Sequence, residues 1–294
     1  MLRDSKGLKI TLLVIVLVVM FVNFLPGDTY SAKQEVTASV QDGYDLAIKA
    51  VAGDVSVTID PAATRISASY SGSGRTRSKL VLEQSGSKVT ISEKYSEKGF
   101  LRFFDFSSTP RMMVVIPQDT ALKSLTASTV SGDIDIETNL IADMIKLSST
   151  SGGVDFLNLE APDGTVQISS VSGNVDGYLV AADKVKISTT SGNAEVYRME
   201  GKNIELTSVS GNINGEAAPG NGDMKLSTVS GEIDVILDTA TNATVTAKTL
   251  SGSLHLGNRD TDGQWDKESA SAVIGDGTGA VEAKTTSGPI TISW

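Results

Sequence analysis

Apolar and polar residues alternate in short runs along most of the chain, and many of these runs meet at a Ser-Gly pair. Ser124–Ile136 (SLTASTVSGDIDI) and Lys184–Val196 (KVKISTTSGNAEV) show the pattern. Alternation with a period of two predicts strands that bury one face, and Gly followed by Asp or Asn predicts a tight corner. Each segment is therefore predicted to contain two short strands joined at a Ser-Gly corner.

The segment occurs in eight copies, and the first seven Ser-Gly pairs are 19 to 21 residues apart. The corner serines are Ser131, Ser151, Ser172, Ser191, Ser210, Ser230, Ser251 and Ser287. Four residues before them stand the apolar Ala127, Leu147, Ile168, Ile187, Leu206, Leu226, Ala247 and Ala283. Two residues before them stand the hydroxyl-bearing Thr129, Ser149, Ser170, Thr189, Ser208, Thr228, Thr249 and Thr285. Equivalent positions thus carry equivalent residues, which is typical of a structural repeat.

Such a repeat favours coils stacked in parallel about 4.8 Å apart, because identical side chains then lie over one another. We therefore predict an all-β fold, a right-handed parallel β-helix (solenoid) with coils of about 20 residues. The handedness follows from the general preference of parallel crossovers. The Ser or Thr before each corner shares the apolar face, so its hydroxyl is expected to bond along the stack. Glycine is expected at the corner because a Cβ there would hinder the backbone.

The chain divides into three predicted regions. Residues 1–32 hold a basic flank, a hydrophobic segment and a linker, residues 33–123 a β-rich layer that caps the solenoid, and residues 124–294 the Ser-Gly repeats. Within the second region, Asp45–Ile59 matches the repeat with Ala52-Gly53 at its corner. Further strands are expected at Arg65–Tyr70, Lys79–Glu83, Lys88–Ser92 and Arg111–Ile116. At the far end, Pro289–Trp294 is expected to form the last strand, with Trp294 covering the open core.

Residues 10–25 form an unbroken hydrophobic run that follows Arg3, Lys6 and Lys9. Sixteen residues span about 24 Å as a helix, slightly less than the roughly 30 Å hydrocarbon core. An uncleaved transmembrane helix in a bacterial cytoplasmic membrane is the preferred interpretation, with the basic flank inside and the solenoid outside. A cleaved signal peptide and secretion are the alternative, although neither Ala32 nor Gly27 offers a good cleavage site.

Composition narrows the chemistry. There is no Cys, which excludes disulfides, thiolate metal sites and a cysteine nucleophile. The net charge of −10 is unevenly placed, because residues 60–123 carry +4 whereas residues 124–294 carry 10 basic and 23 acidic side chains, a balance of −13. A chain with this charge is not expected to bind nucleic acid.

Three of these features together resemble the LiaG-like family of adhesin-type β-strand-repeat proteins of bacteria. They are the N-terminal anchor, the MVVIP segment (Met113–Pro117) and the T-x-SG-(D/N)-I-x-I copies, and the resemblance covers roughly residues 40–294. It implies a right-handed parallel β-helix and a link to cell-envelope stress systems, and it brings no catalytic residues. The insertion at Gly257–Gly279 departs from the family pattern.

No catalytic constellation is predicted, and neither is a cofactor. Parallel β-helices include carbohydrate-active enzymes, but their sites need converging acids, bases or a metal in a cleft walled by long loops. Most coils here leave only short connections, and the single histidine, His255, falls at an outward strand position. A β-helix enzyme is therefore the weakest of the functional hypotheses.

Two surfaces are candidate contact sites. The position four residues after the corner serine holds Asp135, Asp155, Asp176, Glu195, Asn214, Asp234 and His255. Stacking places successive carboxylates about 5 Å apart, which predicts a row that binds divalent cations or a basic partner, or simply a solvated face. The second surface, Phe100, Phe103, Phe104 and Phe106 among basic residues, is interpreted as a hydrophobic plug or as a membrane or partner contact.

These features favour a non-catalytic interaction module outside the cell membrane, serving envelope stress or maintenance. An envelope protein or a cell-wall component is the expected partner. The alternative, which belongs to a different functional class, is a surface adhesin or structural display protein.

Overall fold

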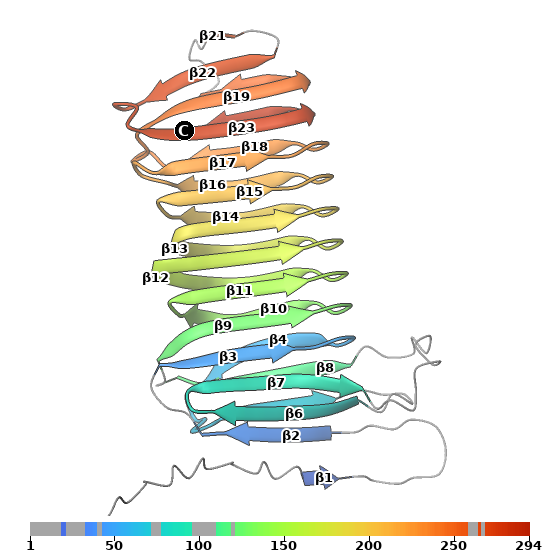
Figure 1. Ribbon diagram of the computed structural model, residues 1–294. Helices are drawn as coiled ribbons and strands as arrows, with labels where there is room; N and C mark the ends of the chain where they lie inside the picture. The colour runs from blue at the N-terminus through green and yellow to red at the C-terminus, as the bar shows by residue number, and fades with distance from the viewer. Residues whose placement is uncertain are drawn as a thin grey trace, which may run out of the picture.

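The computed structural model describes residues 19–21, 33–39, 43–71, 78–95, 110–118, 121–257, 264–265 and 268–294. These residues form strands, turns and bends and no helix, so the all-β prediction is confirmed. The strands lie one above another in a tall stack (Figure 1). Each coil contributes an A strand before its corner and a B strand after it.

The bounds follow in spatial order. The A stack contains β6 (Ser78–Ser85), β7 (Lys88–Tyr95), β3 (Tyr44–Lys49), β9 (Leu122–Thr129), β11 (Met144–Ser149), the second halves of β12 (Val154–Ser170) and β13 (Val175–Thr189), β15 (Asn203–Thr207), β17 (Asp223–Ser227), β23 (Gly279–Ser287), β19 (Ala243–Ser251), β22 (Ser269–Ile274) and β21 (Gln264–Trp265). The B stack contains β1 (Val19–Phe21), β2 (Lys33–Ala38), β5 (Ile66–Ser71), β8 (Arg111–Pro117), β4 (Asp54–Asp60), β10 (Ile134–Ile141), the first halves of β12 and β13, β14 (Ala194–Glu200), β16 (Ile213–Ala218), β18 (Ile233–Leu237), β24 (Ile290–Ser293) and β20 (Leu254–Leu256).

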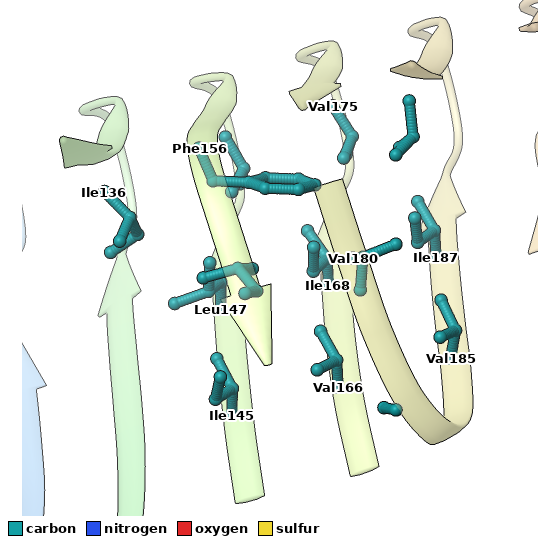
Figure 2. Packing of buried hydrophobic residues seen from close by; sticks show 14 of the residues in the cluster. Ile136, Ile145, Leu147, Phe156, Val166, Ile168, Val175, Val180, Val185 and Ile187 are labelled. Carbon is teal, nitrogen blue, oxygen red and sulfur yellow. The ribbon is translucent and has the colours of Figure 1, made fainter. Parts of the chain in front are cut away.

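The repeat copies pair in parallel, in the register that the repeat predicts. Leu147 lies opposite Ala127 on one side and opposite Ile168 on the other. These apolar positions are fully buried and fill the space between the two stacks in successive columns (Figure 2). The core is continuous from the strands of residues 33–123 into the repeats.

The hydroxyl before each corner bonds along the stack, as predicted. In all eight copies it donates to the carbonyl oxygen of the corner glycine in the neighbouring coil, at 2.8–3.4 Å. Ser149 and Ser170 also accept a hydrogen bond from the N–H of their own corner glycine, at 2.9 Å in both cases. The buried hydroxyls therefore fasten each corner to the next.

The corner glycines are needed for close approach. A Cβ added to any of the eight would lie 1.9–2.2 Å from the carbonyl oxygen of the neighbouring corner glycine. Such a distance is far inside van der Waals contact, so only glycine lets the corners stack at the strand spacing.

The Asp or Asn after the glycine forms a second ladder. Asn174 Oδ1 accepts from the N–H of Asn193 at 3.0 Å, and Asn193 Oδ1 from the N–H of Asn212 at 3.0 Å. Asp133 Oδ1 likewise accepts from the N–H of Gly153 at 2.7 Å. These side chains satisfy corner N–H groups that the strand ladders leave without a partner.

Pro289–Trp294 contains the last strand of the chain, β24, as predicted, but the eighth copy is intercalated in the stack rather than terminal. β23 lies between β17 and β19, because Val281 is opposite both Met224 and Val245 (Figure 1). β22 lies antiparallel to β19 at this end of the A stack, with Ala270 buried. Trp294 packs against the core as a partly buried residue and does not close its end. The long connection after β20 lets the chain form β22 and return between two earlier coils.

The opposite end has the same arrangement. The first coil, β3 and β4, lies between the coil of β7 and β8 and that of β9 and β10. The antiparallel strands β5 and β6 intervene in the chain before β7 returns in parallel. Both stacks thus finish in antiparallel strands at the N-terminal end, and the A stack does so at the C-terminal end, whereas the B stack ends there in β20, which is parallel to β24.

The hydrophobic N-terminal segment is mostly outside the described residues. Its three described residues, Val19–Phe21, form β1 antiparallel to β2 rather than part of a helix. Within the described part of the chain, no helix has the length and apolarity to cross a membrane.

Candidate binding face

The parallel register assembles the predicted acidic row. Asp135, Asp155, Asp176 and Glu195 lie opposite one another on successive B strands, followed by Asn214 and Asp234. Alternation places their side chains outward, since the apolar residues on either side of them are buried in the core. The row is a property of the stack, because each coil supplies only one member.

The row ends differently from the prediction at its C-terminal side. Thr291 of the intercalated copy lies between Asp234 and His255. His255 is therefore two strands away from the nearest carboxylate of the row. At the other end, Arg111 forms an ion pair with Asp135 at 3.3 Å.

Carboxylates at this spacing repel one another. Partial burial raises the pKa of Asp155, and the neighbouring carboxylates of Asp176 and Asp133 raise it further. Burial and then Glu195 raise the pKa of Asp176 in the same way. Burial and Asp155 also raise the pKa of Asp135, against the opposing effect of Arg111. From Asp155 onward the row therefore carries negative charge that a cationic group would stabilise.

Two tyrosines beside the row were not singled out from the sequence. Tyr178 and Tyr197 stack with ring centroids 5.1 Å apart and planes at 5°. Their exposed fractions are 57% and 54%, so both rings stand largely in solvent. The sequence does indicate that these two rings lie side by side, because both tyrosines stand six residues after a corner serine.

A groove of about 330 Å³ opens next to Tyr197. It is lined by Asp176, Gly177, Glu195, Tyr197, Asn214, Gly215, Glu216, Asp234 and Ile236. The cause is local: Val196 is opposite Gly215 and Arg198 is opposite Glu216, so Tyr197 is a bulge residue with no counterpart in β16. Tyr197 therefore has no side chain opposite it in β16, whereas Ile236 is opposite Glu216.

The groove contains four carboxylates, those of Asp176, Glu195, Glu216 and Asp234. None of the ion pairs of the described residues involves them; Arg198, which is close in sequence, pairs with Glu200 and Asp238 instead. No group of three or more His, Asp or Glu residues in the described ranges is arranged to hold a metal ion. The groove thus offers an aromatic face, small floor residues and negative charge.

The second predicted contact surface cannot be placed. Phe100, Phe103, Phe104 and Phe106 lie outside the described residues, in the connection between β7 and β8. Beside this connection, Glu93 accepts hydrogen bonds from Val51 N–H at 2.8 Å, Ala52 N–H at 3.2 Å and the Tyr70 hydroxyl at 2.8 Å. Its buried carboxylate satisfies the corner of the first coil, where Ala50 replaces the usual Ser or Thr.

Three solved structures are similar over most of the chain. A provisionally named cell adhesion protein from Clostridium sporogenes is 9% identical, with 90% of this chain and 99% of that chain covered and a TM-score of 0.27. A provisionally named adhesin from Bacteroides fragilis is 14% identical, with 89% and 96% covered and a TM-score of 0.39. A provisionally named lipid-binding protein from Parabacteroides distasonis is 16% identical, with 91% and 97% covered and a TM-score of 0.43. Similarity this distant transfers no function.

No curated protein matches the chain in sequence. The Toastrack DUF4097 family model, however, matches residues 45–293, which include every Ser-Gly copy and the first coil. This span agrees with the repeat and with the continuous core, and the match does not single out the LiaG-like group that the sequence resembles. The chain is a member of the Toastrack DUF4097 family.

Proposed function

We propose that this protein is a non-catalytic interaction module that binds a basic component of the cell envelope through its acidic row. The carrying observation is the in-register stacking of Asp135, Asp155, Asp176 and Glu195 on one outward face. A rigid stack fixes these carboxylates at the strand spacing, so a partner meets a preformed charged surface. The rod winds to the right in this proposal, as parallel crossovers do.

The hydrophobic segment at residues 10–25 anchors the rod to the cytoplasmic membrane in the same proposal. The basic residues before the segment support an orientation with the rod outside, where it serves envelope maintenance or the response to envelope stress. Deletion of residues 1–32 is expected to move the protein from the membrane fraction to the soluble fraction. The intact mass of the mature protein decides between the anchor and a cleaved signal, because cleavage shortens the chain.

The partner is tested by chemical cross-linking in intact cells with the full chain. We expect envelope components to be captured by the wild type and lost with the combined change Asp135→Asn and Asp155→Asn. Asp143→Asn with Asp163→Asn is the matched control, since both residues are exposed and lie away from the row, Asp143 in the bend before β11 and Asp163 in the middle of β12. Equal capture by both variants would exclude the row as the binding face.

Three other functions are distinguished by cross-linking, by melting and by an activity assay. Targets found only on foreign surfaces would favour the adhesin or display function. A calcium-dependent rise in melting temperature that disappears in the row variant would identify the row as a cation site instead. Hydrolysis of cell-wall glycans that is lost in His255→Ala would contradict the non-catalytic assignment.

A further inference from the structure

The groove beside Tyr197 lies where β16 has no residue opposite this tyrosine. Tyr178 covers one face of the Tyr197 ring, and on the side of β16 Tyr197 has no counterpart, because Gly215 is opposite Val196 and Glu216 is opposite Arg198. Ile236 of β18 closes the groove two strands away. Two strand spacings are about 9.6 Å, which leaves space for one flat group between the ring and Ile236.

The negative charge of the groove indicates which kind of flat group would bind there. Glu195 and Asp234 belong to the strands on either side of β16, and Glu216 belongs to β16 itself. A neutral ring placed among these carboxylates leaves their charges unrelieved, whereas a cation neutralises them. A guanidinium is planar, stacks on aromatic faces and donates several hydrogen bonds to carboxylates, whereas an ammonium is a point charge without a face.

We propose that this groove is a specificity site for an arginine side chain of a basic protein partner. The guanidinium stacks on the open face of Tyr197 and donates hydrogen bonds to Glu195 and Asp234. This assignment rests on the proposed function, since it names the chemistry that the acidic face recognises. The remaining carboxylates of the row supply attraction that does not discriminate arginine from lysine.

The test uses the full-length protein in detergent, titrated with oligoarginine and oligolysine peptides of equal length and charge. We expect oligoarginine to bind roughly two- to fivefold more tightly, the increment of an exposed stacked cation. Tyr197→Ala is expected to weaken the binding of oligoarginine to the level of oligolysine and so to abolish this preference. Leu157→Ala is the control, because Leu157 is an exposed residue that stands at the same position after its corner serine and lies outside the groove.

A second variant keeps every carboxylate. Insertion of a tyrosine between Gly215 and Glu216 gives Tyr197 a counterpart in β16. We expect the inserted ring to occupy the groove and to remove the arginine preference. Circular dichroism and melting confirm that each variant is folded. Equal affinity for the two peptides in the wild type, or an arginine preference that survives both variants, would overturn the proposal.

The same variants separate this proposal from the broader function. Envelope capture that depends on Asp135 and Asp155 but not on Tyr197 leaves the binding face intact and refutes the arginine site. Binding of neutral cell-wall oligosaccharides that requires Tyr197, without any preference between the peptides, would assign the groove to a sugar instead.

Discussion

At the scale of single residues, the repeat depends on glycine at the corner for a steric reason and on Ser or Thr before the corner for their hydrogen bonds. The corner glycines have no Cβ to collide with the neighbouring carbonyl oxygen, and the Ser or Thr hydroxyls satisfy that oxygen. Both residue types were predictable from their recurrence. The carbonyl partner was not, because it belongs to the adjacent coil.

Gly152→Ala is expected to destabilise the protein by about 3 kcal/mol or more, since the new Cβ would lie 2.0 Å from Gly132 O. Gly153→Ala is the matched control, because its Cβ would have no neighbour closer than 3.4 Å. Thermal melting of the two variants provides the comparison. Equal melting temperatures would show that the corners adjust freely.

Ser170→Ala is expected to cost about 1–3 kcal/mol, because it leaves Gly152 O and Gly173 N–H buried without their partner. Ser188→Ala, at an outward and partly exposed position in the next coil, is expected to have a much smaller effect. Denaturant unfolding measures both. Similar losses in the two variants would contradict a special role for the inward hydroxyls.

At the scale of elements, the last coil of the chain is held between two earlier ones. β23 is the parallel neighbour of both β17 and β19, so the last strands of the chain support strands formed before them. In a stack where each coil contacts only its neighbours, loss of one coil opens the structure beyond it while more distant coils stay intact.

Val281→Asp tests whether β19 depends on β23 for its stability. Val281 is fully buried between Met224 and Val245, and a charged side chain there is expected to unfold the C-terminal end. Hydrogen exchange should show lost protection in β19 and preserved protection in β11 and β12. Protection that persists in β19 would mean that it stacks without β23.

At the scale of the whole molecule, the parallel stack turns one acidic residue per coil into a continuous charged row. Carboxylates that are distant in the sequence become neighbours, and burial with mutual repulsion raises the pKa values of Asp135, Asp155 and Asp176. The acidic row therefore carries a cost to stability.

Asp155→Asn is expected to raise the melting temperature at neutral pH. Because the pKa of Asp155 is raised from 3.8, the folded chain binds more protons than the unfolded chain just above that value. Stability therefore increases as pH falls through the raised pKa toward 3.8, and the advantage of the variant shrinks over the same window. Melting at about pH 7 and about pH 4 measures the difference.

Asp238→Asn is the control of opposite sign. Hydrogen bonds from Ala240 N–H and then from Arg198 lower the pKa of Asp238, so its charged form favours the fold. This variant is expected to melt lower at neutral pH. An Asp155→Asn protein that melts at or below the wild type at neutral pH would show that repulsion in the row is negligible.

The sequence alone determined the repeat, the inward and outward positions, the inward hydroxyls and the acidic register, because these depend on the residue pattern within one coil. Only the tertiary structure decided which coils are neighbours, and hence that Thr291 separates Asp234 from His255 and that the eighth copy lies inside the stack. Equivalent copies form equally good strand ladders with one another, so their order depends on how connections and capping strands close the ends. The groove at Tyr197 was likewise decided there, because it arises from a one-residue mismatch between two adjacent strands that neither strand shows by itself.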